Sequence, residues 1–197
     1  MEYAIVFLPL IGSLICYFGK SIGNLFSQLI SSLLVSISAI FSMIVFYNGL
    51  TYNEYGNFLI FQWINSGNLF VNWSINVDPL SSIMLVVVTL VSALVHFYSI
   101  GYMSHDPHKP RFMSYLSLFT FSMLCLVVSD NFIQLFFGWE GVGLCSYLLI
   151  GFWYKKNSAN NAAIKAFIVN RVGDFGLAIG IFLIFFYFGT VNFNEVF

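Results

Sequence analysis

Charge is what this sequence has least of. Only 8% of its 197 residues are Asp, Glu, Lys or Arg, whereas about a quarter of the residues in a soluble globular domain are charged. Hydrophobic residues make up 59% of the chain, and the mean hydropathy is +0.88. These values argue against a soluble domain and favour a protein whose solvent is membrane lipid. The few Lys and Arg residues form no basic cluster, so nucleic acid is not an expected partner.

Several kinds of functional site lack the residues they would need. The sequence contains neither a glycine-rich phosphate loop nor a cluster of metal ligands. His96 is the single histidine expected inside the membrane, which excludes a haem held by two histidines. We interpret His96 as a polar packing residue, with a place in a proton path as the alternative, and expect His105 and His108 on a solvated loop. Three cysteines without a close pair are interpreted as packing residues rather than ligands or disulfides: Cys16, Cys125 and Cys145.

Long apolar runs are what the sequence does have. Six of them are expected to form transmembrane helices of roughly 20 residues, at about 3–19, 27–48, 80–101, 112–129, 131–152 and 162–188. The first is short, and Pro9 is expected to bend it. It lacks the basic start and small-residue cleavage site of a cleavable signal. We therefore predict an all-α polytopic membrane protein with a single transmembrane domain over residues 1–197.

The loop at residues 49–79 predicts a small β-hairpin. Apolar and polar side chains alternate over residues 71–77, and residues 58–64 are rich in strand-forming types. Residues 65–68 between them have the composition of a turn. We expect this hairpin on the outer membrane face, where its aromatic side chains suit the interface. Asp78 and Pro79 then suit the cap and first turn of a helix, a role that we favour over proton handling for Asp78.

The positive charges predict the orientation. Those in the loops and at the helix ends are Lys20, Lys109, Arg111, Lys155, Lys156 and Lys165. With six helices they all fall on one side, while residues 49–79 and the turn at 129–130 carry no Lys or Arg. The positive-inside rule places the charged side in the matrix or cytoplasm. Both termini are therefore expected on the opposite side.

Glu140 is the most informative residue. It falls near the middle of the apolar segment 131–152. An ionised carboxylate is costly at that depth, so Glu140 is expected to pair, to be protonated or to face a wet cavity, which makes it a functional-site hypothesis by default. The alternative is a structural carboxyl that is hydrogen-bonded to a neighbouring helix.

The last predicted helix carries a second acid and a cation. Arg171 and Asp174 are three residues apart and Asn170 and Asp174 four, so they share a helix face, and Arg171–Asp174 is a plausible buried ion pair. The two last helices are antiparallel about Asn157, with Glu140 17 residues before it and Asp174 17 residues after it. Because the rise per residue is the same in both helices, the two carboxylates are expected at similar depth.

Proton transfer is the chemistry that these residues favour. A desolvated carboxyl keeps its proton more readily, and a neighbouring cation favours the charged form, so a changing ion pair can switch an acid between the two states. Asn131 and Gln134 could hold the water that such transfer needs. Two stripes of small residues are expected to let helices approach closely: Gly138, Gly141 and Cys145, and Gly173, Gly176 and Gly180.

Residues 138–152 and 165–176 closely resemble the antiporter-like subunit 5 of respiratory complex I. The similarity extends through residues 78–81 and 102–111 and covers essentially the whole chain. It implies a membrane-arm subunit of the proton-pumping NADH:ubiquinone oxidoreductase, with Glu140 as the principal carboxylate of the first proton half-channel and Asp174 as its neighbouring partner. It also implies that other subunits bind NADH, FMN, the iron–sulfur clusters and ubiquinone, so no cofactor, metal or redox site is expected in this chain. A sequence rich in Phe, Ile, Tyr and Asn suggests the mitochondrial inner membrane, with a bacterial plasma membrane as the alternative.

The chain departs from that family in length. Family members have more than twice as many helices, and the lysine that partners the glutamate, the central lysine, the second half-channel and the lateral helix have no counterpart here. We therefore expect an N-terminal fragment of a larger antiporter-like fold, with the other complex I subunits and a separate chain carrying the remaining half as partners; a truncated product is the alternative. Two other functions stay open: a subunit of a multisubunit cation/proton antiporter, and a non-conducting structural component of the complex I arm.

Overall fold

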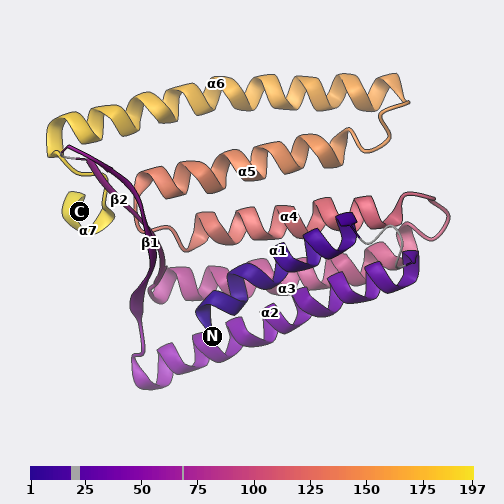
Figure 1. The fold of residues 1–197 in the computed structure, drawn as a ribbon, viewed down its shortest axis with the longest axis horizontal. Coiled ribbons are helices and arrows are strands. Elements are labelled where there is room, and N and C mark those ends of the chain that lie inside the picture. The colour runs from indigo at the N-terminus through magenta and orange to yellow at the C-terminus, as the bar shows by residue number, and fades with distance from the viewer. Residues whose placement is uncertain (19–22, 68) are drawn as a thin grey trace. The chain divides into compact units, whose positions relative to one another are not determined.

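The computed structural model describes residues 1–18, 23–67 and 69–197, and most of them are helical (Figure 1). Five of the described helices are long and apolar enough to cross a membrane: α2 (Asn24–Tyr52), α3 (Pro79–Tyr102), α4 (Lys109–Val127), α5 (Phe132–Ile150) and α6 (Asn157–Phe188). The elements that complete the fold are α1 (Glu2–Phe18), β1 (Gly56–Ser66), β2 (Leu69–Val77) and the short α7 (Phe193–Val196). The predicted class, a helical polytopic membrane protein with one small hairpin, is confirmed.

The bounds of several elements differ from the predicted ones. α1 has 17 residues, which at 1.5 Å each is about 26 Å and less than the roughly 30 Å of a bilayer core. α6 begins at Asn157 rather than near residue 162, because its first turn is polar and hydropathy does not reveal it. The hairpin strands are longer than predicted, and α7 was not predicted. Lys20 and Asn68, which entered the charge pattern and the turn signature, lie outside the described residues.

The chain divides into two compact units that interleave along the sequence. The first consists of Met1–Tyr55 and Asp78–Leu124, and the second of Gly56–Val77 and Cys125–Phe197. The hairpin therefore belongs to the unit that contains α5, α6 and α7. The single transmembrane domain expected over residues 1–197 stays a prediction.

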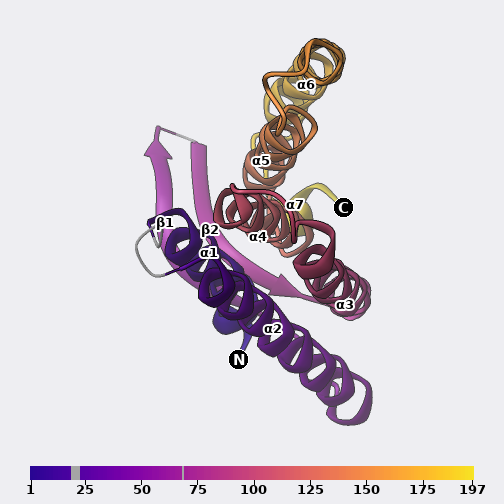
Figure 2. The same ribbon diagram turned by 90° about the vertical axis from the view of Figure 1, so that its right-hand side faces the viewer.

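Small hydroxyl side chains join the helices of the first unit. In the end-on view of Figure 2, α1 lies against α2, which also packs on α3. The hydroxyls of Ser31 and Ser117 are 2.7 Å apart, and those of Ser42 and Thr89 are also 2.7 Å apart. All four residues are buried. Such interhelical hydrogen bonds between small residues are a common way of holding helices together in lipid.

His96 is buried and hydrogen-bonded within this unit. Its side chain is fully buried, and its Nδ1 atom lies 2.7 Å from the carbonyl oxygen of Ser92. Its Nε2 atom lies 3.0 Å from the hydroxyl of Ser117 on α4. Nδ1 must donate to a carbonyl, so Nε2 accepts from the hydroxyl, and both ring nitrogens are satisfied. These contacts agree with the packing role expected from the sequence.

α3 begins as its sequence predicts. The Asp78 Oδ1 atom accepts the backbone N–H of Ser81 at 2.6 Å, and the Ser81 hydroxyl accepts the backbone N–H of Asp78 at 2.7 Å. This reciprocal pair is a capping box, and Pro79 occupies the first turn. The predicted capping role of Asp78 is confirmed.

The second unit gathers its hairpin, the start of α5, the end of α6 and α7 at one end (Figure 1). Gln134 of α5 binds both backbone groups of Ser74 on β2: its Oε1 accepts the N–H at 3.2 Å and its Nε2 donates to the carbonyl at 2.7 Å. Asn131 caps α5 by accepting the N–H of Gln134 and donates to the carbonyl of Asn72. The sequence suggested that Asn131 and Gln134 could hold water. In the structure they fasten the hairpin to α5.

Glycine is required at one of the predicted small-residue positions. A Cβ atom on Gly138 would lie 2.6 Å from the backbone nitrogen of Leu126, so any other residue there would push the chain apart. At Gly173, Gly176 and Gly180, by contrast, a Cβ atom would meet no described atom within 4 Å. Among the described residues, the expected close contact is therefore present on α5 and absent along α6.

Candidate intramembrane charge site

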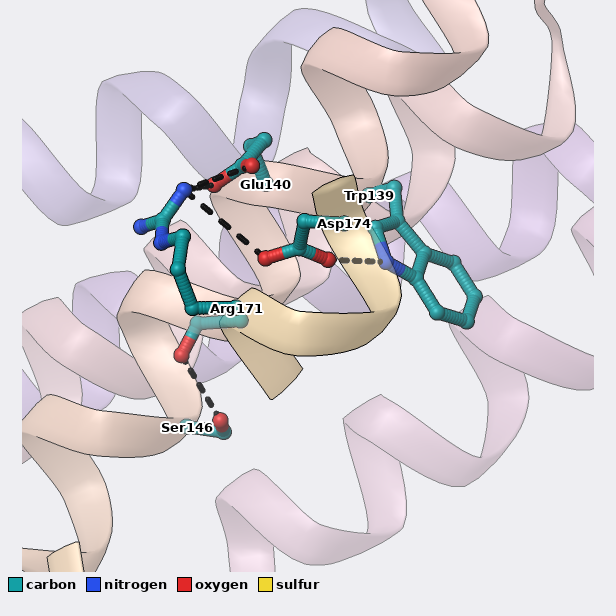
Figure 3. Close-up of polar contacts among 6 residues, drawn as sticks. Trp139, Glu140, Ser146, Arg171 and Asp174 are labelled. Atoms are coloured by element: carbon teal, nitrogen blue, oxygen red, sulfur yellow. Dashed lines mark hydrogen bonds and ion pairs between the residues drawn. The ribbon is translucent and has the colours of Figure 1, made fainter. Parts of the chain in front are cut away.

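The three residues predicted to carry the chemistry come together in the second unit. Arg171 lies between Glu140 of α5 and Asp174 of α6, as Figure 3 shows. Its Nη1 atom is 2.6 Å from both Oε1 and Oε2 of Glu140 and 3.7 Å from Oδ2 of Asp174. One guanidinium is thus shared unequally by two carboxylates, which we call the charge triad.

Two features of the helices position the triad. α5 and α6 run side by side in opposite directions, joined by a short loop (Figure 1). Arg171 and Asp174 are one turn apart on α6, so both side chains point toward the same neighbour. Glu140 and Asp174 are equally far along their helices from the connecting loop, so Glu140 lies at the level of Arg171 and Asp174. A single guanidinium reaches both acids, as their predicted similar depth requires.

The expected Arg171–Asp174 ion pair is present, and its burial is the part of the prediction that needs correction. The side chain of Arg171 is 51% exposed, so the pair is not buried, although that of Asp174 is only 8% exposed. The nearer partner of Arg171 is Glu140, because a carboxylate on a neighbouring helix can face the guanidinium directly, whereas a residue three positions away on the same helix meets it from the side.

Trp139 is a member of the site that sequence reasoning missed. Its indole Nε1–H donates to Oδ1 of Asp174 at 2.8 Å (Figure 3). The two oxygens of Asp174 therefore have different partners, the indole and the guanidinium. The sequence feature that could have indicated this role is the tryptophan itself, because a buried indole N–H usually donates to an acceptor. Trp139 directly precedes Glu140, so consecutive residues of α5 contact both members of the pair on α6.

The charges of the triad do not balance. Two carboxylates and one guanidinium leave one negative charge, which one proton would neutralise. The rigid planar guanidinium can accept either carboxylate as partner. Its carbon also lies 4.8 Å from the centre of the Phe167 ring, a cation–π contact that steadies it between the acids. The guanidinium is thus held within reach of both carboxylates.

One side of the triad is open. The side chain of Arg171 is half exposed and that of Glu140 is 23% exposed. A charge on a membrane-spanning helix is costly unless it meets protein, water or a counter-ion. This open edge is therefore where a polar neighbour is needed. Among the described residues, no group of three or more His, Cys, Asp or Glu is placed to hold a metal ion.

Fold and site together define a polytopic membrane protein that keeps an ion-paired carboxylate within its membrane helices. A family model described as NADH-ubiquinone oxidoreductase (complex I), chain 5 N-terminus matches residues 63–113. A second, described as the transmembrane region of NADH:quinone oxidoreductase/Mrp antiporter, matches residues 129–197, which include the whole triad.

Curated relatives agree with these matches. NADH-ubiquinone oxidoreductase chain 5 of Chondrus crispus is 56% identical over 100% of this chain, and that of Arabidopsis thaliana is 52% identical over 100%. NADH-quinone oxidoreductase subunit L of Rickettsia felis is 53% identical over 98% of this chain. The chain spans 30% of the length of each of these relatives. It belongs to the family of complex I chain 5, the antiporter-like subunit, and corresponds to its N-terminal part.

A solved structure has the same fold. A chain of the membrane-bound sulfane sulfur reductase, an archaeal respiratory membrane complex, superimposes with a TM-score of 0.81 over 100% of this chain and 39% of its own length. Its sequence identity is 17%, so the likeness concerns the fold alone.

Proposed function

We propose that this chain acts in the membrane arm of a proton-pumping NADH:quinone oxidoreductase and contributes part of a proton half-channel centred on Glu140. The observation that carries this proposal is the sharing of Arg171 by Glu140 and Asp174 on adjacent membrane helices. Membership of the complex I chain 5 family supports it.

The geometry suits an alternating ion pair. When Glu140 is ionised, it holds the guanidinium of Arg171 at 2.6 Å. When a proton reaches a carboxylate oxygen of Glu140, the attraction is lost and Arg171 can move the short way to Asp174, now 3.7 Å distant. Its return favours the charged form of Glu140 and expels the proton. Trp139 keeps Asp174 in place throughout, so that the guanidinium moves rather than the carboxylate.

The remaining parts of the function are assigned to other components. NADH, FMN, the iron–sulfur clusters and ubiquinone are proposed to bind to other subunits of the complex, and this chain to carry no redox site. Its proposed partners are those subunits, and the portion of the relatives' length that this sequence does not match is proposed to lie against the open edge at Arg171. We propose a mitochondrial inner membrane location with both termini facing the intermembrane space; a bacterial plasma membrane is the alternative.

A second function has its own support. The family model that matches residues 129–197 describes Mrp antiporters as well as NADH:quinone oxidoreductases. A subunit of a multisubunit cation/proton antiporter would use the same triad to exchange a proton for a cation. Co-purification with NADH dehydrogenase activity would favour complex I, and its absence the antiporter. If the chain only supports the arm and does not conduct protons, replacing Glu140 should not change proton transport.

Replacement of Glu140 by Gln tests the proposal. Gln keeps the shape and removes the titrating group, so we expect the assembled complex to lose coupled turnover by at least about tenfold, since a proton-transfer group commonly contributes about 10²–10⁴-fold. Glu140→Asp and Asp174→Asn should have smaller effects. Proton uptake per NADH oxidised in sealed membranes, with assembly checked on native gels, is the measurement. Glu54→Gln, at an exposed position between α2 and β1, is the matched control.

A result at the parental level would contradict the proposal. If Glu140→Gln assembles fully and pumps as well as the parent, Glu140 is a structural carboxyl and the chain is a non-conducting component of its complex.

A further inference from the structure

An apolar groove of about 220 Å³ lies in the second unit, between the start of β2, the first turns of α5 and the last turns of α6. The eight described residues that line it are all apolar, and they include Leu69, Ile133 and Phe182. For scale, an apolar cavity of about 150 Å³ is large enough to bind benzene. The groove can therefore accommodate several methylene groups of a hydrocarbon chain.

A smaller polar pocket of about 120 Å³ adjoins this groove. The two share three lining residues, Leu69, Phe185 and Val191. Thr190, Asn192 and Glu195 supply polar groups to the lining of this pocket. Among the described residues that line the groove or the pocket, Glu195 is the one that carries a charge. Groove and pocket are therefore neighbours, one apolar and one polar.

The site lies where a helix leaves the hydrocarbon. α6 ends at Phe188 and is capped by Gly189, which has the left-handed conformation with φ 71° and donates its N–H to the carbonyl of Phe185. Two aromatic side chains of the last turn, Phe186 and Tyr187, are 80% and 75% exposed. Exposed aromatic residues at a helix end are typical of the membrane–water interface. With this helix end at the interface, the groove would face the acyl-chain region and the pocket the headgroups.

We propose that groove and pocket bind one phospholipid with an amine headgroup, its acyl chain in the groove and its ammonium on the carboxylate of Glu195. The charge decides between headgroups. An ethanolamine ammonium carries N–H donors for a charge-assisted hydrogen bond to the carboxylate. An anionic headgroup such as glycerol phosphate meets a like charge at the same place, and none of the described lining residues is a cation that could offset it.

The carboxyl of Glu195 is held in its charged form. Hydrogen bonds from Thr190 and Asn192 lower its pKa below the ordinary value of a glutamate. A group with a lowered pKa keeps its charge as the pH falls through the ordinary carboxyl range and loses it only below that range. The preference for the amine headgroup should therefore persist at mildly acidic pH.

Photo-crosslinking in the intact assembly tests the site. The probes are phosphatidylethanolamine and phosphatidylglycerol that carry a diazirine in one acyl chain, offered at equal fractions in nanodiscs. We expect phosphatidylethanolamine to label peptides from residues 178–195 severalfold more than phosphatidylglycerol. Glu195→Gln should make the two lipids equal, and Glu195→Lys should reverse the order. Glu54→Gln, which changes an acid far along the sequence from the site, should leave the preference unchanged.

A second variant tests the groove separately. Ala178→Phe places a ring among the lining residues and should reduce labelling by both lipids, with assembly on native gels as the check on folding. Equal labelling by both lipids in the parent, or a preference that Glu195→Gln does not change, would overturn the proposal. Absence of labelling in the parent would also overturn it, since another protein segment then fills the groove. None of these outcomes depends on proton transport by Glu140.

Discussion

At the scale of single residues, the site consists of one cation that two acids compete for. Glu140, Arg171 and Asp174 could be found from the sequence because a charged residue inside an apolar run needs an explanation. Trp139 could not, because a tryptophan is ordinary in a membrane helix and the direction of its N–H depends on a side-chain rotamer. The unequal sharing of Arg171 could not be predicted either, since it depends on distances between two helices.

Trp139→Phe should reveal the coupling within the triad. Phe keeps an aromatic ring but removes the N–H that holds Oδ1 of Asp174, so Asp174 becomes free to turn toward Arg171 and weaken its bond to Glu140. We expect a loss of coupled turnover that is smaller than that of Glu140→Gln. The double variant with Asp174→Asn should be no worse than Asp174→Asn alone, because residues that act through one another are not additive.

The measurement is the pH profile of proton uptake for the single and double variants in assembled complex. Trp153→Phe, outside the helices, is the control. Additive losses, or a parental pH profile in Trp139→Phe, would show that the indole serves packing only.

At the scale of elements, the helices and the hairpin can be predicted from the sequence, whereas the packing of one element on another cannot. Apolar runs, alternation and the capping residue Asp78 are local signals, and each predicted an element that is present. The docking of the hairpin on α5 rests on Gln134 and Ser74, which are 60 residues apart. No local pattern marks such a pair. The polar first turn of α6 was not predicted, because hydropathy indicates burial in lipid rather than helix formation.

Gln134→Leu should loosen the hairpin from α5. The change leaves the N–H and carbonyl of Ser74 without partners, and an unsatisfied buried polar group costs about 1–3 kcal/mol. Hydrogen exchange of residues 69–77 should accelerate while exchange within α3 stays unchanged. Gln62→Leu, an exposed glutamine on β1, is the control. If both variants exchange like the parent, the paired amide contributes nothing to docking.

At the scale of the whole molecule, the distribution of charge predicts how the chain crosses the membrane. Single cysteines placed at Asn157 and Asn65 should react with an impermeant reagent from opposite sides, the first from the matrix or cytoplasm and the second from the other face. Both positions are exposed, and the native cysteines are buried, so background labelling should be low. Reaction of both positions from the same side would end the six-helix topology.

Because the two units interleave along the sequence, the hairpin is synthesised well before the helix on which it docks. The hairpin leaves the ribosome between α2 and α3, yet it belongs to the unit completed only by α5, α6 and α7. At about 5–20 residues per second, the 60 residues between Ser74 and Gln134 take about 3–12 s to translate. During that interval the backbone groups of Asn72 and Ser74 that bind Asn131 and Gln134 lack these partners. Nascent chains stalled shortly before residue 134 should therefore be the ones most dependent on an insertion chaperone.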